Sequence, residues 1–138
     1  MRIISLNVGL PSTQRYEARK VITAGTKQPV PRAVLRFGNF EGDGQANQLN
    51  HGGLEKALCL YPFGHYPYWN RHLGCDLKPC ALSENLTVSG AIETEVCVGD
   101  VFGIGEAMVQ LSQARMPCAK QAGKNESKMV PKVMVRFG

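Results

Sequence analysis

Glycine and proline residues divide this sequence into short apolar runs. The chain has 15 glycines and 8 prolines in 138 residues. No apolar run approaches the roughly 20 residues that a membrane-spanning helix needs. Such punctuation favours many strands and turns over long helices. The length suits a single core. We therefore expect one domain over residues 1–138, mainly β with short helices (α+β).

The element boundaries follow from this punctuation. A helix is predicted from Pro62 to Leu73, because proline suits a first turn and Gly74 suits the position after a helix. Its face of Tyr66, Trp69 and Leu73 is interpreted as core packing rather than a ligand box. Strands are predicted over Arg2–Val8, Glu17–Thr23, Pro29–Phe37 (starting after Pro31), Lys56–Tyr61, Glu84–Val88, Val101–Gly105 and Ala107–Leu111.

Two of these segments bear on function. The apolar run Ala107–Leu111 is expected to form a buried strand, paired with Val101–Gly105 as a hairpin. The segment Gly38–Gly53 carries five glycines and reads as a long loop. Loops of this length inside compact domains tend to be functional, so we expect it to form a wall of a functional site.

The composition is that of an ordinary soluble protein. Hydrophobic residues make up 43% and charged residues 20% of the chain, and the net charge is +5. A mildly basic chain fits an anionic small ligand or weak attraction to nucleic acid. No block of lysine and arginine with interleaved aromatics is present, so neither a nucleic-acid partner nor a membrane is expected. The oligomeric state is left open.

The cysteines indicate a reducing compartment. Their number, five, is odd, and no export signal precedes the first strand, which together predict free thiols in a cytoplasmic protein. Cys59 and Cys97 lie in apolar runs and are expected to be buried and inert. Cys75 and Cys80 flank a polar loop and are expected to see solvent.

Cys118 is the strongest candidate for chemistry. Pro117 should stop the preceding strand, which puts the thiol on the turn just beyond it. Arg115 and Lys120 place two cations within a few residues, and nearby positive charge favours the reactive thiolate. The alternative is that Cys118 is one more small buried hydrophobe.

A second candidate is the motif His51-Gly52-Gly53 followed by Lys56. Paired glycines let backbone N–H groups approach an anion closely, and the imidazole and ammonium would add positive charge. The alternative is that the glycines only shape a turn.

Glu84 and Asn85 stand together at the entrance of a predicted strand. Buried there, they could hydrogen-bond a heterocycle. Equally, Asn85 could satisfy neighbouring loop backbone, which is the commoner use of such a residue.

The sequence offers two further arrangements of cysteine and histidine. Cys118 and His51 could form a nucleophilic pair across the fold, but no local signature supports a particular protease or transferase. A zinc site is disfavoured because no C-x-x-C pair is present and the His65-to-His72 spacing is too long. Its possible ligands would be His65, His72, Cys75 and Cys80.

Several motifs, in order, resemble those of one family. The chain resembles MOSC domains, the module related to the C-terminal part of molybdenum-cofactor sulfurases, and in particular the stand-alone bacterial YiiM type. The resemblance covers nearly the whole chain. The motifs are Ile4–Gly9, Glu41–Ala46, His51-Gly52-Gly53 with Lys56-Ala57, Tyr61-Pro62 with His65–Trp69, Glu84–Val88, Val96–Val101 and Gln113–Cys118.

The resemblance implies both a fold and an activity. It implies a MOSC-type β-barrel that binds molybdenum cofactor (molybdopterin), with Cys118 as the thiolate that ligates molybdenum. It implies reduction of N-hydroxylated bases and amines, a reaction shared with the mitochondrial amidoxime-reducing component. At family level it also carries associations with pyridoxal phosphate binding and detoxification. The cofactor-binding residues would be His51, Gly52, Gly53, Lys56, Glu84, Asn85 and Arg115.

The chain departs from the family pattern at three places. Leu82 and Ser83 stand where the family usually has Phe and Gly in the positions before Glu84, and Ala119 replaces an aromatic residue. Full-length relatives continue with helical sequence, so we expect the chain to be C-terminally short or divergent after Lys120.

Three functional hypotheses result. The first is a molybdenum-dependent oxidoreductase that receives electrons from a separate reductase, because no flavin, nicotinamide or iron–sulfur motif occurs in the sequence. The second is a non-catalytic module that carries the cofactor or its sulfur. The third is an inactive MOSC fragment.

Overall fold

The computed structural model describes residues 1–16, 18–115 and 124. Strands dominate and the helices are short, as the sequence predicts. The strands are β1 (Arg2–Val8), β2 (Ser12–Tyr16), β3 (Arg19–Thr23), β4 (Gln28–Pro29), β5 (Leu35–Arg36), β6 (Asn39–Phe40), β7 (Leu60–Pro62), β8 (Leu86–Ser89), β9 (Val101–Ile104) and β10 (Ala107–Gln110). The helices are α1 (Gln48–His51) and α2 (Tyr66–Leu73), with 3₁₀ turns η1 (Leu54–Lys56) and η2 (Phe63–His65).

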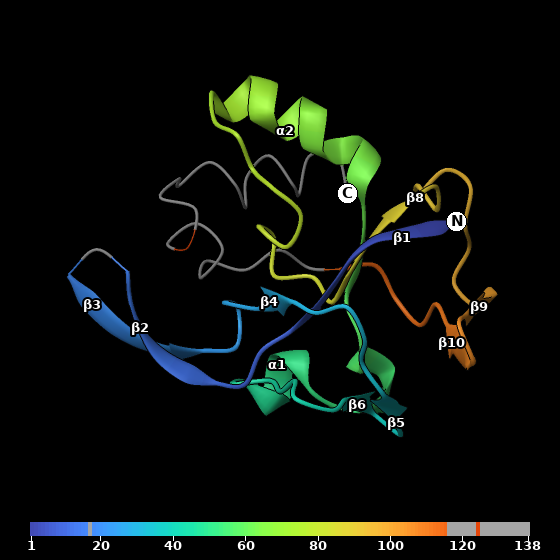
Figure 1. The fold of residues 1–138 in the computed structure, drawn as a ribbon, viewed down its shortest axis with the longest axis horizontal. Helices are drawn as coiled ribbons and strands as arrows, with labels where there is room; N and C mark the ends of the chain where they lie inside the picture. The colour runs from blue at the N-terminus through green and yellow to red at the C-terminus, as the bar shows by residue number, and fades with distance from the viewer. Residues whose placement is uncertain (17, 116–123, 125–138) are drawn as a thin grey trace.

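The centre of the fold is a four-stranded sheet in the order β4-β1-β8-β7. β8 is antiparallel to β1, with Leu6 opposite Leu86, and parallel to β7, with Leu60 opposite Leu86. A register shift between Ile3 and Ser5 marks a bulge in β1. In Figure 1 helix α2 lies on one side of this sheet, and α1 with the β5–β6 pair lies on the other.

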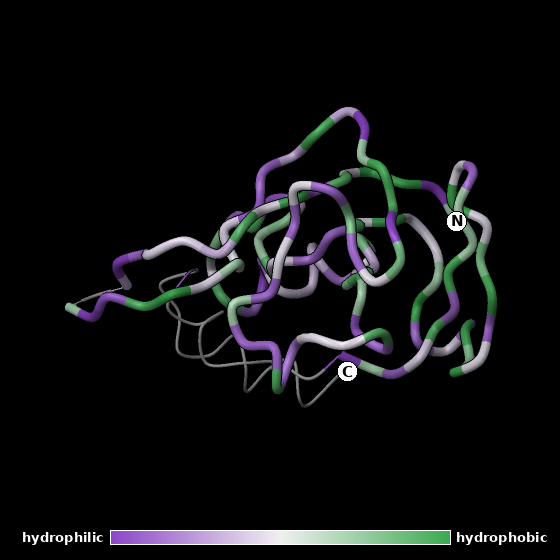
Figure 2. Tube along the Cα trace, turned by 90° about the horizontal axis from the view of Figure 1, so that it is seen from below, coloured by the Kyte–Doolittle hydropathy of each residue, from purple (hydrophilic) through white to green (hydrophobic). Residues whose placement is uncertain are grey.

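Three two-stranded hairpins, β2–β3, β5–β6 and β9–β10, complete the described strands. The β2–β3 hairpin projects from the body in both views (Figures 1 and 2). Its tube alternates between hydrophilic and hydrophobic colours, as a hairpin with little core of its own should (Figure 2).

The expected closed barrel is not found among the strands of the described residues, which form an open mixed sheet and separate hairpins. The physical reason lies at the sheet edges. The edge strands β4 and β7 are short and contain Pro29 and Pro62, which have no N–H to donate to a further strand.

Two hydrophobic clusters pack on the central sheet. One, against α2, contains Tyr61, Tyr66, Trp69 and Leu82, which confirms the aromatic helix face as core. The other contains Phe40, Leu86 and Val88, packed on β1, β7 and the segment before β5. The central strand β8 is buried because it contributes to this cluster and has strands on both sides.

Several predicted boundaries are confirmed. β1 has the predicted bounds, and β9 pairs with β10 across the predicted turn. Helix α2 ends at Leu73, and Gly74 follows it with a left-handed φ of 62°, which a residue without Cβ adopts at little cost. The helix begins later than predicted, at Tyr66, because η2 intervenes between Pro62 and α2.

Other predicted boundaries were wrong. The strand predicted after Pro31 within Pro29–Phe37 is shorter than expected and covers only β5 (Leu35–Arg36), while Pro29 ends β4 in a different sheet. Lys56 lies in η1, and the strand predicted from it begins only at Leu60. The polar strand β2 was missed, and it pairs with β3 along its whole length.

The prediction that Ala107–Leu111 is buried was also wrong. Residues of β10 alternate between partly buried and exposed, and Met108 is 70% exposed.

Candidate functional site

A large cleft of about 1020 Å³ runs along the structure. The Gly38–Gly53 segment lines it, as predicted for a site wall, although the segment contains β6 and α1 rather than only loop. The other walls come from η1, β7, the start of α2 and the chain from β10 to Arg115. Of the predicted site residues, those that line the cleft are His51, Lys56, Asn85 and Arg115.

Arg115 is the last described residue before Cys118, and its side chain lies in the cleft. Its Nη1 donates to Cys59 Sγ at 2.9 Å. Cys59 immediately precedes β7 and also lines the cleft. Burial raises the pKa of the Cys59 thiol, and the Arg115 guanidinium opposes that shift without reversing it. The thiol of Cys59 is therefore held in its neutral form, as predicted from its apolar surroundings.

The His51-Gly52-Gly53 motif forms the junction between α1 and η1. Gly52 is the C-cap of α1, and its N–H donates to Gln48 O at 3.0 Å. A Cβ at Gly52 would lie 2.7 Å from that same carbonyl oxygen, so only glycine fits. Gly53 has φ of 95° and connects to η1. The N–H of Gly52 is used to cap the end of α1, so it agrees with the alternative that the glycines shape a turn rather than bind an anion.

Lys56 brings a positive charge to this end of the cleft, which His51 also lines. Lys56 Nζ donates to Asn50 O at 3.0 Å, which holds the ammonium near the end of α1. An ammonium has three donors, so further donors remain for a ligand.

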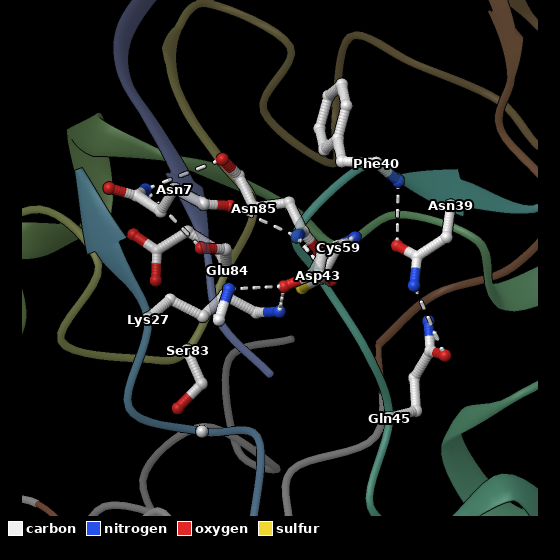
Figure 3. Close-up of polar contacts among 12 residues, drawn as sticks. Asn7, Lys27, Asn39, Phe40, Asp43, Gln45, Cys59, Ser83, Glu84 and Asn85 are labelled. Atoms are coloured by element: carbon white, nitrogen blue, oxygen red, sulfur yellow. Dashed lines mark hydrogen bonds and ion pairs between the residues drawn. The ribbon is translucent and has the colours of Figure 1, made fainter. Parts of the chain in front are cut away.

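Asn85 does not offer its amide to the cleft. Its Nδ2 donates to Asn7 O at 3.2 Å and to Asp43 Oδ2 at 2.9 Å, while its Oδ1 accepts from Cys59 N at 3.1 Å. These contacts tie the segments containing Asn7, Asp43 and Cys59 to the entrance of β8 (Figure 3). The Asn85 side chain therefore hydrogen-bonds neighbouring backbone and side-chain groups rather than a ligand, which is the second of the two roles considered for it.

A buried ion pair lies beside Asn85 and was not recognised from the sequence. Lys27 Nζ pairs with Asp43 Oδ1, and the two side chains are 7% and 1% exposed (Figure 3). Asp43 Oδ1 also accepts from Gly9 N at 2.8 Å. No local signal could identify the pair, because Lys27 and Asp43 lie sixteen residues apart on different segments.

Glu84 is fully buried and does not line the cleft. Its Oε1 accepts from Tyr66 OH at 2.5 Å, Thr87 Oγ1 at 2.6 Å and Cys80 N at 2.9 Å. Its Oε2 has no hydrogen-bond partner within residues 1–16, 18–115 and 124. Burial, with the Glu84 carboxylate beside it, raises the pKa of Tyr66. Glu84 therefore joins α2, β8 and the chain before it.

Lys124 extends a second, partly buried cation toward this region. Its Nζ donates to Cys80 O at 2.6 Å, Gly25 O at 2.8 Å and Ser83 Oγ at 3.5 Å. Burial lowers the pKa of the Lys124 ammonium. The sequence marks it only as part of a polar stretch, so its role was missed.

Two of the cysteine predictions are confirmed and two were wrong. Cys75 is exposed and Cys59 has a raised pKa, as predicted. Cys80 is buried, not exposed, because it packs under the Glu84 contacts, and burial raises the pKa of its thiol. Cys97 is exposed, not buried, because it lies in a turn before β9 rather than within a strand. Cys118, Pro117 and Lys120 lie outside the described residues.

Another wall of the cleft is aromatic and acidic. Tyr61, His65, Trp69 and Glu93 all line it. His65 Nε2 lies 2.7 Å from Glu93 Oε2, and Trp69 Nε1 donates to Tyr61 OH at 2.6 Å. The sequence predicted only the packing role of the aromatic residues.

The described part of the chain holds no group of three or more His, Cys, Asp or Glu side chains arranged to bind a metal. Within the same residues, no helix has the length and apolar character needed to cross a lipid bilayer.

Comparison with known proteins identifies the family. The family model described as MOSC domain matches residues 47–138. The chain is 50% identical to YflK of Bacillus subtilis over 123 residues, which cover 88% of the chain and 56% of YflK. It is 35% identical over 83 residues to a protein named Reductase from Gibberella moniliformis, covering 57% of the chain and 15% of that protein.

The fold agrees with that of a solved relative. The crystal structure of YiiM from Geobacillus stearothermophilus matches with a TM-score of 0.74 and 36% identity, over 98% of the chain and 62% of that chain. The chain thus spans little more than half the length of YflK and under two thirds of the solved YiiM.

Fold and cleft together define a small mixed-sheet domain with cationic side chains gathered along one cleft. The chain belongs to the MOSC domain family.

Proposed function

We propose that the protein is a molybdenum-cofactor-dependent reductase of N-hydroxylated bases and amines, with Cys118 as the thiolate that ligates the metal. In that reaction the N–O bond breaks, two electrons and two protons are consumed, and water leaves. The electrons come from a separate reductase protein. The bound cofactor would supply the two-electron redox chemistry.

The observation that carries this proposal is the position of Arg115. Its guanidinium lies in the cleft against Cys59, three residues before Cys118 in the sequence. The family membership and the name of the Gibberella relative support a redox function. Binding of pyridoxal phosphate and a role in detoxification stay family-level predictions.

The residues along the cleft fit an anionic cofactor only in part. Lys56 and Arg115 provide positive charge to a phosphate-bearing group, and hydrogen bonds from cationic donors to phosphate are strong. His51 adds an imidazole to the same cleft. Gly52 and Asn85 have polar groups committed to the fold, so we assign them to shaping the cleft. Glu84 does not line the cleft, and its Oε1 is held by Tyr66, so we assign it to supporting the strand behind the wall. Gly53 would let the chain turn between α1 and η1.

The proposal predicts that Cys118→Ser abolishes reduction of an amidoxime or hydroxylamine by an artificial electron donor. The thiolate is the form that ligates a soft metal centre, and a serine hydroxyl does not replace it. The matched control is Cys97→Ser, which changes an exposed thiol outside the cleft and should keep full activity. Activity is measured on protein purified from a host that makes the cofactor.

The melting temperature of both variants is measured alongside activity. A folded Cys118→Ser protein that still reduces the substrate would contradict the catalytic role. Molybdenum analysis separates the remaining hypotheses: metal without turnover in the wild-type protein indicates a carrier, and no metal at all indicates an inactive module.

Lys56→Ala tests the cationic end of the cleft. Because the ammonium is only partly buried, we expect cofactor retention to weaken about tenfold, the lower end of the range for a charge-assisted contact. Molybdenum content after dialysis measures this. Lys78→Ala is the control, because Lys78 is an exposed lysine paired with Asp76 and lies outside the cleft. Equal molybdenum in both variants would leave Lys56 as a surface charge.

A further inference from the structure

The aromatic and acidic wall of the cleft has no part in the proposed cofactor contacts. It is formed by Tyr61 in β7, His65 in η2, Trp69 in α2 and Glu93 in the chain after β8. Tyr61 and Trp69 are 6% and 3% exposed and belong to the core cluster against α2, so they form the fixed base of the wall. The side chains of His65 and Glu93 are 26% and 47% exposed, so both remain accessible from the cleft.

The Glu93 carboxylate is oriented by one contact and open at its other oxygen. His65 Nε2 lies 2.7 Å from Oε2, and these residues lie 28 positions apart in the sequence. Oε1 of Glu93 makes no hydrogen bond to the residues that the structure describes. The His65 ring also lies near the rings of Tyr61, with centroids 5.7 Å apart, and Trp69, at 6.4 Å. The imidazole thus has a fixed direction and holds the carboxylate at the aromatic wall.

The other carboxylates along the cleft differ from Glu93. Asp43 is neutralised by Lys27 and buried beneath the cleft surface. Glu55 lies in η1, on the side that carries Lys56. Glu93 alone among these three combines an oriented carboxylate with adjacent aromatic rings.

An open carboxylate oxygen beside aromatic rings has a definite ligand chemistry. Planar cations with several N–H groups, such as guanidinium and amidinium, donate to a carboxylate and pack on aromatic surfaces. A neutral group of the same shape can pack there but gains less from the carboxylate.

We propose that Tyr61, His65, Trp69 and Glu93 form a substrate subsite that binds a planar cation of guanidinium type, with Glu93 Oε1 as the acceptor. The role of this subsite in catalysis rests on the proposed function. If the protein is such a reductase, the subsite makes N-hydroxyguanidines better substrates than neutral amidoximes. Glu93 is the specificity-determining residue, and His65 is a positioning residue.

The single tryptophan of the chain makes the subsite directly testable. Trp69 lines the cleft at this wall, so its fluorescence should respond to a ligand bound there. The probe is phenylguanidine, and its neutral isostere phenylurea is the comparison ligand. The full chain is titrated with each. Calorimetry measures the same dissociation constants independently of the optical signal.

Glu93→Gln keeps the shape of the side chain and removes its charge. We expect phenylguanidine to bind the variant about tenfold more weakly than the wild type, as for loss of one partly exposed charge-assisted contact. Glu95→Gln is the matched control, because it removes an equal charge from an exposed residue that does not line the cleft. Its affinity should stay within about twofold of the wild type, and phenylurea should bind all three proteins weakly and alike.

Equal affinity of the wild type for phenylguanidine and phenylurea would overturn the subsite. Unchanged phenylguanidine affinity in Glu93→Gln would also overturn it and leave the His65–Glu93 pair as a surface contact. The binding measurement does not need the cofactor. If Glu93-dependent binding is found but no N-hydroxylated compound is reduced, the subsite stands and the proposed reductase function fails. If the protein reduces N-hydroxylated compounds but Glu93→Gln prefers N-hydroxyguanidines as strongly as the wild type does, the reductase function stands and the subsite fails.

Discussion

The central sheet around β8 and the hairpins β5–β6 and β9–β10 are built from similar apolar runs, but their side chains differ greatly in burial. Leu86 and Val88 in β8 are 1% and 0% exposed, whereas Phe37 beside β5 is 92% and Met108 in β10 is 70% exposed. The polar groups differ in the same way. The Lys27–Asp43 pair is buried near β8, and the Arg36–Glu41 pair of the β5–β6 hairpin is exposed.

This difference shows that the formation of a strand and the burial of its side chains are separate properties. Both regions form strands, because alternation and turn residues act locally. Of these strands, β8 has a strand on each side and a cluster packed against its side chains, whereas each hairpin strand pairs with one neighbour among the described residues. Substitutions should therefore cost much more in the β8 layer than in the hairpins, and matched pairs of variants can test this.

The largest difference is expected between the two ion pairs. Asp43→Asn leaves the buried Lys27 ammonium without its charge partner, which should lower the free energy of unfolding by about 3–5 kcal/mol. Glu41→Gln removes the partner of Arg36, and an exposed pair contributes about 0–1 kcal/mol. Urea unfolding of both variants measures the two values. Similar losses would show that the buried pair is no more important to the fold than the surface pair.

A smaller difference is expected for apolar side chains. Leu86→Ala should cost about 2–5 kcal/mol, because it leaves a cavity in the buried cluster that Leu86 forms with Phe40 and Val88. Met108→Ala, on the exposed side of β10, should stay within about 0.5 kcal/mol. The same denaturant experiment applies. A large loss in Met108→Ala would mean that another surface covers the β9–β10 hairpin.

The smallest effect concerns pH and compares Cys80 with Cys97. Burial raises the pKa of the Cys80 thiol, so the unfolded chain loses this proton at lower pH than the folded chain. The associated stability is present below the unfolded thiol pKa, and it is lost as pH rises from there through the folded pKa. The lowered pKa of Lys124 acts in the opposite direction. Between about pH 8 and pH 10, the melting temperature of wild type should fall about 2 °C more than that of Cys80→Ala.

Cys97→Ala is the control for this pH series. Its thiol is exposed in the turn before β9, so the variant should follow the wild-type curve. If Cys80→Ala also follows that curve, the buried thiol does not contribute to the pH dependence. Thermal melts at constant ionic strength make the comparison.

The candidate site was only partly predictable for the same reason. The sequence identified Arg115, Lys56 and His51, and the structure brings all three to one cleft. It also identified Glu84 and Asn85, but their polar atoms point into the fold, toward partners such as Tyr66 and Asp43. Residue type and neighbours suggested chemistry, but they did not show which way a side chain faces.

The sequence by itself determined the local features of this protein. The bounds of β1, the β9–β10 turn and the end of α2 at Gly74 follow from residues within a few positions of one another. Backbone propensities and turn residues act over that range. The mainly-β character follows from the same short-range signals.

Only the tertiary structure decided which residues are buried and which meet. Asn85 contacts Asp43 across 42 positions, and His65 contacts Glu93 across 28. Cys80 became buried and Cys97 exposed, against the expectation from their neighbours in sequence. Burial and hydrogen-bond partners depend on how sheets and loops pack, and that packing joins segments which carry no signal for one another in the sequence.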